Sequence, residues 1–298
     1  MTTTVKSTPV TGQSDGAPVS GEPPALRRIW SRWSLVLAVL VALTAGLWAS
    51  FPGLFTGRDP LAVDPTQRLL SPSADHIFGT DLLGRDSYAR TVYGARNSLT
   101  GAGLAVLVAV VVGSVAGSLA AWFGGLADTL VMRFIDVVLS IPGFLLAIAL
   151  VVLFTAETGG AGLVPSAIAV GLTSSATFAR LIRAEVLKVR SSAYVEAAVT
   201  SGATTPAILF RHVVPNSLAP TLSLVTVQCG VAVIWIASLS FLGLGTQPPD
   251  PEWGLLVSEG RKYIAGYGWL TVFPALTIVA VVLSANHISR YLTSRSTR

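Results

Sequence analysis

Six long uncharged stretches set the pattern of apolar and polar positions along this chain. Each stretch is long enough for the roughly 20 residues that a helix needs to cross a bilayer. The third span should begin before its uncharged core, near Leu130, and so include Arg133 and Asp136. The pattern therefore predicts an all-α integral membrane protein with six transmembrane helices. The uncharged stretches are residues 33–57, 98–123, 137–156, 158–179, 213–249 and 263–289.

The segments around these stretches are more polar. Residues 1–26 are rich in Ser, Thr, Pro and Gly without an apolar period, so we expect a disordered tail, which we extend to residue 32. A secretory signal is the competing interpretation of the first stretch, but 33–57 is longer than a typical signal core and lacks a clear cleavage site. The division we expect is a tail at 1–32, a first transmembrane helix at 33–57, an outer segment at 58–97, a transmembrane core at 98–290 and a tail at 291–298.

The charges between the spans predict the orientation. Six spans place both termini on one side, and Arg27, Arg28 and Arg32 flank the first span. Assigning these residues to the cytoplasm puts most of the 20 Lys and Arg residues inside. We therefore expect a multi-pass protein of the cytoplasmic membrane with cytoplasmic N- and C-termini.

Two segments then lie outside. The Arg residues of 58–97 exclude burial in lipid, so this segment should lie along the surface or pack on the bundle. The loop at 245–268 contains a Pro-rich turn followed by Trp253, which we expect to anchor at the membrane interface.

The composition agrees with a membrane protein. Of 298 residues, 52% are hydrophobic and 12% are charged, and the mean hydropathy is +0.67. Soluble domains carry about 25% charged residues. The net charge of +5 is explained by cytoplasmic Lys and Arg, so we expect no nucleic-acid partner. Cys229 is the only cysteine, which excludes an intramolecular disulfide.

Enzyme signatures are missing from the sequence. It contains no G-x-x-x-x-G-K-[S/T] run for holding ATP and no G-x-S-x-G nucleophile motif. Its His residues (His76, His212 and His287) and Cys229 have no metal-ligand spacing. We expect no catalytic residue, cofactor site or metal site in this chain.

Three features inside the spans have two interpretations each. Arg133 and Asp136 share a helix face at i, i+3 and form either a structural ion pair at the helix end or part of a proton or ion relay. Gly113 and Gly117 permit close helix approach, in a heterodimer contact or in internal packing. The prolines Pro142, Pro165 and Pro274 either kink helices that move or are ordinary membrane-helix prolines.

A polar stretch at 191–216 is predicted to form a helix, a turn and a second helix. Gly202 permits the break after the first helix, and Pro206 suits the first position of the second, which Pro215 would end. A short helical hairpin of this kind is either a docking element for a partner or a plain connecting loop.

Glu196-Ala197-Ala198-x-x-x-Gly202, followed at a fixed distance by Val214-Pro215, resembles the EAA loop of bacterial ABC-importer permeases. The similarity extends to the peptide/nickel group, and within it to the C-type subunit of dipeptide and oligopeptide importers. It covers about residues 27–286. Further matching positions are Gly79, Thr80, Asp81, Gly84, Arg85, Asp86, Arg96, Arg133, Asp136, Tyr194, Arg211, His212, Pro215, Asn216 and the run 240–245.

The resemblance implies the type I ABC-importer permease fold with a cytoplasmic coupling helix around Ala203–Phe210, in which Ala203 and Pro206 contribute to ATPase coupling. It also implies a homologous second permease, two ATPase subunits or one fused ATPase that bind ATP and Mg²⁺, an extracytoplasmic binding protein and a peptide substrate. After Asn286 the chain lacks the Gly-Asp and second Arg-Asp cluster common in the family.

Other functions remain as alternatives at this point. A same-family importer of nickel, a metal chelate or a glycoside is the first. An ion-coupled secondary transporter would need buried acids, and only Asp136 approaches that requirement. A non-transporting scaffold would not need the EAA hairpin.

Overall fold

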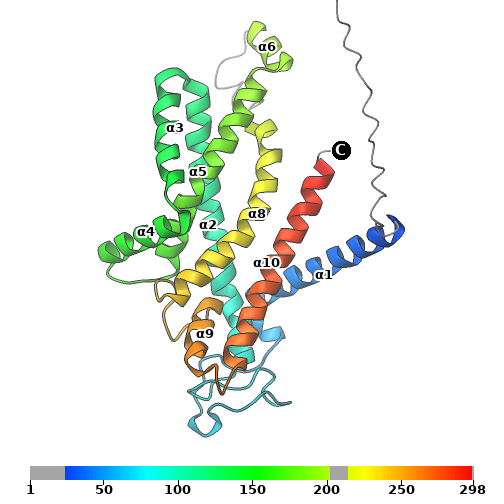
Figure 1. Ribbon diagram of the computed structural model, residues 1–298, viewed down its shortest axis with the longest axis vertical. Coiled ribbons are helices and arrows are strands. Elements are labelled where there is room, and N and C mark those ends of the chain that lie inside the picture. Colours follow the sequence, from blue (N-terminus) through cyan, green and yellow to red (C-terminus); the bar gives the residue numbers. More distant parts are fainter. Residues whose placement is uncertain (1–23, 202–213, 297–298) are drawn as a thin grey trace, which may run out of the picture. The chain divides into compact units, whose positions relative to one another are not determined.

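The computed structural model describes residues 24–201 and 214–296, and the regular secondary structure of these residues is helical (Figure 1). The chain comprises two compact units, residues 1–34 and 35–298, and the described part of the first is the beginning of α1. The only sheet-like pairing among the described residues is an isolated antiparallel bridge between Thr80 and Asp86. The all-α prediction is confirmed for this part of the chain. The elements are α1 (Pro24–Ser50), η1 (Pro52–Leu54), η2 (Pro65–Gln67), α2 (Ser87–Phe123), α3 (Gly125–Ser140), α4 (Gly143–Thr158), α5 (Leu163–Arg190), α6 (Ala193–Thr200), α8 (Val214–Phe241), α9 (Trp253–Gly260), η4 (Arg261–Tyr263) and α10 (Trp269–Ser296).

Fewer helices than expected meet a length and hydropathy test for membrane spans. Among the described residues, α1, α2, α8 and α10 are long and apolar enough, and α3 with α4 makes a fifth if the bent pair is one span. Helix α5 is not among them, because its last turns carry charged residues from Arg180 to Arg190. The predicted count of six is therefore four or five by this criterion.

The third predicted span is broken rather than continuous. Helix α3 ends at Ser140 and α4 begins at Gly143, and the two are bent by 98°. Pro142 lacks the N–H that would continue the helix, and the residue before it, Ile141, takes the extended conformation that proline imposes. Pro274, by contrast, lies inside α10 without ending it.

Several predicted boundaries also differ. Helix α1 already begins at Pro24, inside the segment expected to be a disordered tail, and ends at Ser50 rather than at residue 57. Helix α2 begins at Ser87, so its first three turns belong to the segment expected to lie outside the span. Helix α10 continues to Ser296, beyond the predicted boundary at residue 290.

The core of the second unit is the packing of α2 against α5. Gly113 and Gly117 face α5, and a Cβ on Gly113 would lie 2.5 Å from the carbonyl oxygen of Ser175. A Cβ on Gly117 would meet the backbone of Ala179. These two glycines therefore serve internal packing, which decides between the two interpretations of the G-x-x-x-G pattern. The buried small residues recur every fourth position along α2, at Gly101, Ala105, Ala109, Gly113, Gly117 and Ala121.

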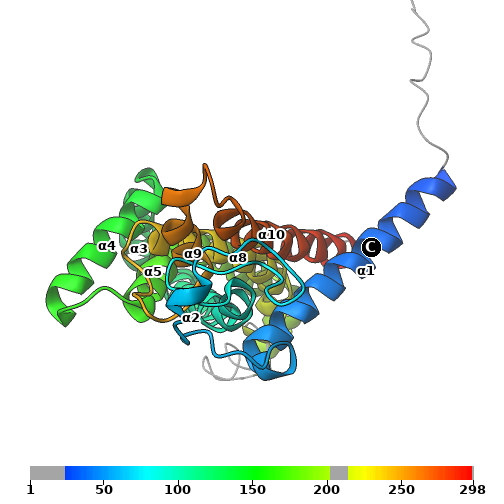
Figure 2. The same ribbon diagram turned by 90° about the horizontal axis from the view of Figure 1, so that it is seen from below.

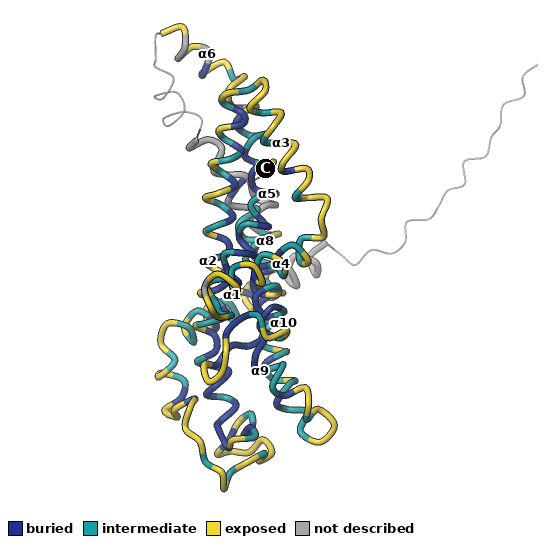
Figure 3. Tube along the Cα trace, turned by 90° about the vertical axis from the view of Figure 1, so that its left-hand side faces the viewer, coloured by how far each residue is buried: buried dark blue, intermediate teal, exposed yellow. Residues whose placement is uncertain are grey.

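The opposite face of α2 is apolar and exposed. Leu107, Val111, Val115 and Leu119 are between 48% and 59% exposed. Figure 3 shows the contrast between buried stretches of α2 and the exposed outer surface of α3. Contiguous apolar surface of this kind is rare on soluble monomers and suits contact with hydrocarbon or with another apolar protein surface.

Candidate functional site

The residues singled out from the sequence lie at two ends of the long helices of the second unit. Helix α6 lies at one end, and the segment 51–86 lies with α9 at the other (Figure 1). Figure 2 views the unit from the end that carries α9.

The first end holds the beginning of the predicted hairpin. Only Ser191 and Ser192 separate α5 from α6, which contains Tyr194, Glu196, Ala197 and Ala198. Gly202, Ala203, Pro206, Arg211 and His212 lie outside the described residues. Pro215 and Asn216 lie in the first turn of α8, where the missing N–H of Pro215 is tolerated. The second helix of the predicted hairpin, which Pro215 would end, lies outside the described residues.

Helix α6 is attached to the ends of α2 and α5. Val195 is 3% exposed and packs in a small cluster with Ala121 of α2 and Val186 of α5. Arg190 donates to the carbonyl oxygens of Ala121 and Trp122 at 3.2 and 3.1 Å. A cation near the C-terminal carbonyls of a helix is favourable. Tyr194 is 46% exposed, so one face of α6 is buried and another is open.

The charged residues at this end pair between helices. Asp136 of α3 accepts a hydrogen bond from Arg180 of α5 at 2.7 Å, so it pairs across to α5 and not with Arg133 on its own helix. Asp128 of α3 forms a two-bond contact with Arg183 at 2.5 Å for each bond. The pairing explains how the charged end of α5 is accommodated beside α3.

At the other end, the residues of the resemblance from Gly79 to Asp86 form a tight loop in front of α2; we call residues 76–86 the motif loop. Gly79 and Gly84 have φ of 70° and 76°, and a Cβ at either position would meet backbone, of Leu70 and Asp64 respectively. Both positions therefore require glycine. Thr80 accepts from the N–H of Leu70 at 2.8 Å and is 0% exposed.

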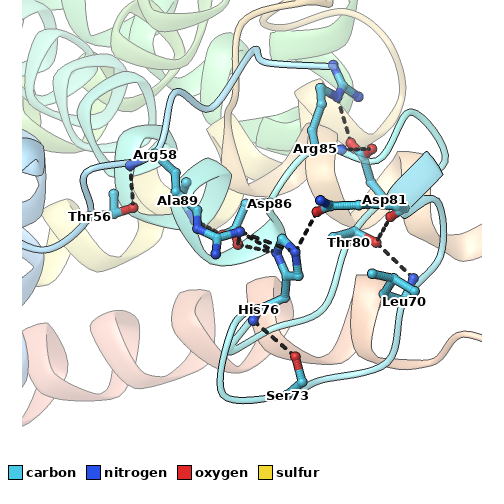
Figure 4. Close-up of polar contacts among 11 residues, drawn as sticks. Thr56, Arg58, Leu70, Ser73, His76, Thr80, Asp81, Arg85, Asp86 and Ala89 are labelled. Atoms are coloured by element: carbon cyan, nitrogen blue, oxygen red, sulfur yellow. Dashed lines mark hydrogen bonds and ion pairs between the residues drawn. The ribbon is translucent and has the colours of Figure 1, made fainter. Parts of the chain in front are cut away.

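Asp86 connects the motif loop to α2. Its carboxylate accepts from the N–H of Ala89 at 2.8 Å and so caps the helix. His76 lies 2.8 Å from the same carboxylate, and Arg58 lies 3.4 Å from it (Figure 4). This carboxylate therefore holds the helix start, the motif loop and the segment after α1 together.

A four-residue ion network joins the motif loop to α9. Asp81 accepts from Arg85 at 2.7 Å and from Arg90 at 2.6 Å. Arg90 also donates to Glu259 of α9 at 2.8 Å, and its side chain is 1% exposed. The expectation that segment 58–97 packs on the bundle holds for this part, because Arg90 is enclosed by protein. The spacing of Arg90 and Glu259 in the sequence gave no signal of this contact.

A second buried carboxylate begins α9. Glu252 is 0% exposed, and its carboxylate accepts from the N–H of Leu255 at 2.9 Å and from the hydroxyl of Ser98 at 2.8 Å. Burial raises the pKa of Glu252 above its ordinary value, and these hydrogen bonds oppose the shift. Glu252 and Ser98 join α9 to α2.

The prediction that Trp253 anchors at the membrane interface is wrong. The side chain is 0% exposed, and its Nε1–H donates to the carbonyl oxygen of Thr91 at 2.9 Å, so it anchors α9 to α2 inside the protein. Tryptophan beside prolines fits an interfacial belt and a buried hydrogen-bonded anchor equally well at the level of sequence. Arg96, another residue of the resemblance, is exposed on α2 and outside these networks.

No group of three or more His, Cys, Asp and Glu residues in the described ranges could hold a metal ion. The structure thus brings together Asp81, Arg85, Arg90 and Glu259 in one network and Glu252, Ser98 and Trp253 in another. Both networks are built to fix the positions of helices.

Comparison with known proteins gives relatives along most of the chain. The dipeptide transport system permease protein DppC of Alkalihalophilus pseudofirmus is 38% identical over 85% of this chain and 82% of its own length. The probable D,D-dipeptide transport system permease protein DdpC of Escherichia coli is 37% identical over 84% of this chain and 82% of its own. The glutathione transport system permease protein GsiD of Pectobacterium atrosepticum is 37% identical over 84% of this chain and 81% of its own.

Solved structures share the fold at low sequence identity. An inward facing conformation of the MetNI methionine ABC transporter aligns with a TM-score of 0.54 and 19% identity, covering 68% of this chain and 95% of that one. The family described as binding-protein-dependent transport system inner membrane component matches residues 97–298. The chain therefore belongs to the family of binding-protein-dependent transport system inner membrane components.

Proposed function

We propose that this chain is the permease subunit of an ATP-driven ABC importer that takes up short peptides across the cytoplasmic membrane. The observation that supports the proposal best is the 37–38% identity to three permeases named for dipeptides, D,D-dipeptides and glutathione. These cargoes share a short peptide-like backbone with free carboxylate and amino groups. Nickel, a metal chelate or a glycoside is the alternative cargo within the family.

The proposed topology has six crossings, made by α1, α2, the bent pair α3–α4, α5, α8 and α10. Counting α5 as a crossing is supported by its pairing with α3 through Asp128 and Asp136, which offsets the charge at its end. Both termini and α6 then lie in the cytoplasm, and the motif loop and α9 lie outside. The exposed apolar face of α2 would contact lipid or the second permease.

We further propose that the segment 191–216 docks in a cleft of an ATPase subunit. ATP and Mg²⁺ would be bound by that partner. Val195 of α6 packs against α2 and α5, and Arg190 at the end of α5 bonds to the end of α2. These contacts support the proposal, because a displacement of the docked segment would move both long helices. Closure of two ATPases would then switch two permeases between outward and inward states as rigid bodies.

The partners implied are a homologous second permease, two ATPase subunits or one fused ATPase, and an extracytoplasmic binding protein that delivers peptide. Uptake of labelled alanyl-alanine into vesicles that hold this full assembly tests the function. We expect uptake that requires ATP and the binding protein, and no comparable uptake of nickel. Uptake that instead follows an ion gradient without ATP would establish a secondary transporter, and a tagged chain that co-purifies without an ATPase would favour a scaffold.

Gly202→Asp tests the coupling. We expect lost peptide uptake at a near-normal level of the protein in the membrane. Gly160→Asp is a matched control, because a Cβ at Gly160 would meet nothing within 4 Å and the residue lies between α4 and α5. Wild-type uptake by Gly202→Asp, or equal loss in the two variants, would contradict docking through this hairpin.

A further inference from the structure

A cavity of about 430 Å³ lies among the motif loop, the start of α2, α9, η4 and α10. Its volume falls within the range of about 300–1,000 Å³ that is typical of small-molecule sites. It lies at the end of α2 that is far from α6 (Figure 1). Leu256, Leu270 and Pro274 supply apolar wall, and the charged residues of the ion network supply the polar wall.

The charges around this cavity are unbalanced. Arg85, Arg90, Arg261 and Lys262 line it against only two carboxylates, Asp81 and Glu259. Both carboxylates are already engaged by Arg85 and Arg90. The exposed cations Arg261 and Lys262 therefore leave the cavity with a surplus of positive charge, which attracts an anionic group.

Arg90 adds a second, independent observation. Its side chain is 1% exposed, and only Nη1 is used in the contacts with Asp81 and Glu259. Nε and Nη2 have no hydrogen-bond partner among the described residues. Buried donors without an acceptor are rare, and they add positive potential behind the cavity wall.

We propose that this cavity binds the carboxylate of a short peptide cargo at the outer end of the transport route. The inference rests on the proposed function for the peptide and for the outer location. The surplus cations attract the carboxylate, the buried Arg90 adds positive charge behind the cavity wall, and the apolar wall accommodates the peptide's carbon skeleton. The site would hold the cargo after the binding protein releases it.

Equilibrium dialysis on the purified membrane assembly, with the binding protein left out, tests the site directly. The probes are alanyl-alanine and its C-terminal amide, which lacks the carboxylate. We expect the acid to bind at least roughly tenfold more tightly than the amide, since a charge-assisted bond is lost with the carboxylate. Arg261→Ala and Lys262→Ala should each weaken binding of the acid about fivefold, as expected for one charge at about 4 Å in water, and leave the amide unchanged.

Two further variants sharpen the test. Arg96→Ala removes an exposed cation from α2 outside the cavity and should change neither affinity. Arg90→Lys keeps the buried positive charge and should preserve the difference in affinity between the acid and the amide. The exposed Arg261 and Lys262 keep the inference testable if Arg90→Lys does not fold.

Equal binding of acid and amide, or no binding of the acid up to about 10 mM, would overturn the inference. An Arg96→Ala effect equal to that of Arg261→Ala would also overturn it, because the attraction would then come from the general charge of this end. If Arg261→Ala and Lys262→Ala weaken binding of the assembly to the binding protein but leave its affinity for the peptide unchanged, the inference is wrong, and the two cations serve docking of the binding protein instead. ATP-dependent uptake by the complete assembly separates the outcomes: if uptake persists, only the cavity is wrong, and if it is absent, the proposed function fails.

Discussion

Gly113 offers the sharpest test of how the membrane core is held together. A Cβ at this position would lie 2.5 Å from the carbonyl oxygen of Ser175 and 2.5 Å from the Cβ of Phe178 on α5. Ordinary carbon contacts lie at about 3.5–4.0 Å, so Gly113→Ala requires α2 and α5 to separate by roughly 1 Å. The oxygen belongs to a helix backbone and cannot rotate away.

The magnitude follows from two opposing effects. Overpacking costs about 1–3 kcal/mol, and replacing a helical Gly by Ala returns about 1 kcal/mol of helix propensity. Gly103, on the same helix, has nothing within 4 Å of a Cβ, so Gly103→Ala receives the propensity gain without the clash. The two variants should therefore differ by about 1–3 kcal/mol, with Gly113→Ala the less stable.

Heating scans of the purified chain in detergent provide the assay. A change of 1 kcal/mol shifts the midpoint by roughly 2–4 °C for chains of 150–250 residues, so Gly113→Ala should unfold several degrees below Gly103→Ala. Gly117→Ala clashes with Ala179 one turn further on, so the double variant at 113 and 117 should cost less than the two single costs added. A midpoint for Gly113→Ala at or above that of Gly103→Ala would refute the close packing of α2 on α5.

Three further outcomes are expected. Asp136→Asn should leave ATP-dependent uptake within about twofold, and the free energy of unfolding within about 1 kcal/mol, of the wild-type values, because Asp136 and its partner Arg180 are 55% and 58% exposed. Abolished uptake would point to an ion relay. A double-mutant cycle on Asp128 and Arg183, read by heating scans, should give a coupling of about 1 kcal/mol, and strictly additive effects would contradict a pair that joins α3 to α5. The raised pKa of Glu252 means that the folded protein holds the proton more tightly than the unfolded chain. The contribution of Glu252 to stability is therefore full below the ordinary pKa and is lost as pH rises through the raised pKa. Glu252→Gln should lack this loss in unfolding midpoints measured from pH 4 to pH 9, and parallel pH profiles of the variant and the wild type would contradict the assignment.

The apolar stretches predicted the long helices because hydropathy over about 20 residues is a local property. The start of α2 was missed for a physical reason. In the sequence the uncharged stretch 98–123 begins just after Arg96, and Arg90 lies further from it still. In the fold Arg90 is neutralised by Asp81 and by Glu259, which lies 169 residues further along the chain. No pattern around Ser87 indicates that partner, so only the folded chain shows that the helix already begins at Ser87.

The sequence predicted where the candidate site lies in the chain, but not the contacts that its residues make. The motif loop was located by resemblance, and the two glycines with positive φ explain why it contains Gly79 and Gly84. The i, i+3 spacing of Arg133 and Asp136 predicted a pair that the structure replaces with Arg180 of another helix. Spacing describes what is close on one helix, whereas pairing depends on which helix lies alongside.

The two ends of the unit are connected by a pair of helices that cannot slide past each other. Gly113 and Gly117 bring backbone against backbone, and a Cβ at Gly171 of α5 would likewise meet the backbone of Ala105. Backbone contacts of this kind are set by the register of both helices, so α2 and α5 should move as one body. Only two residues separate α6 from α5, and the ion network of Arg90 is fixed to the other end of α2. Under the proposed coupling, we therefore expect a displacement of α6 to reach the cavity as a rigid rotation. Coupling over this distance then requires no chain of small side-chain changes.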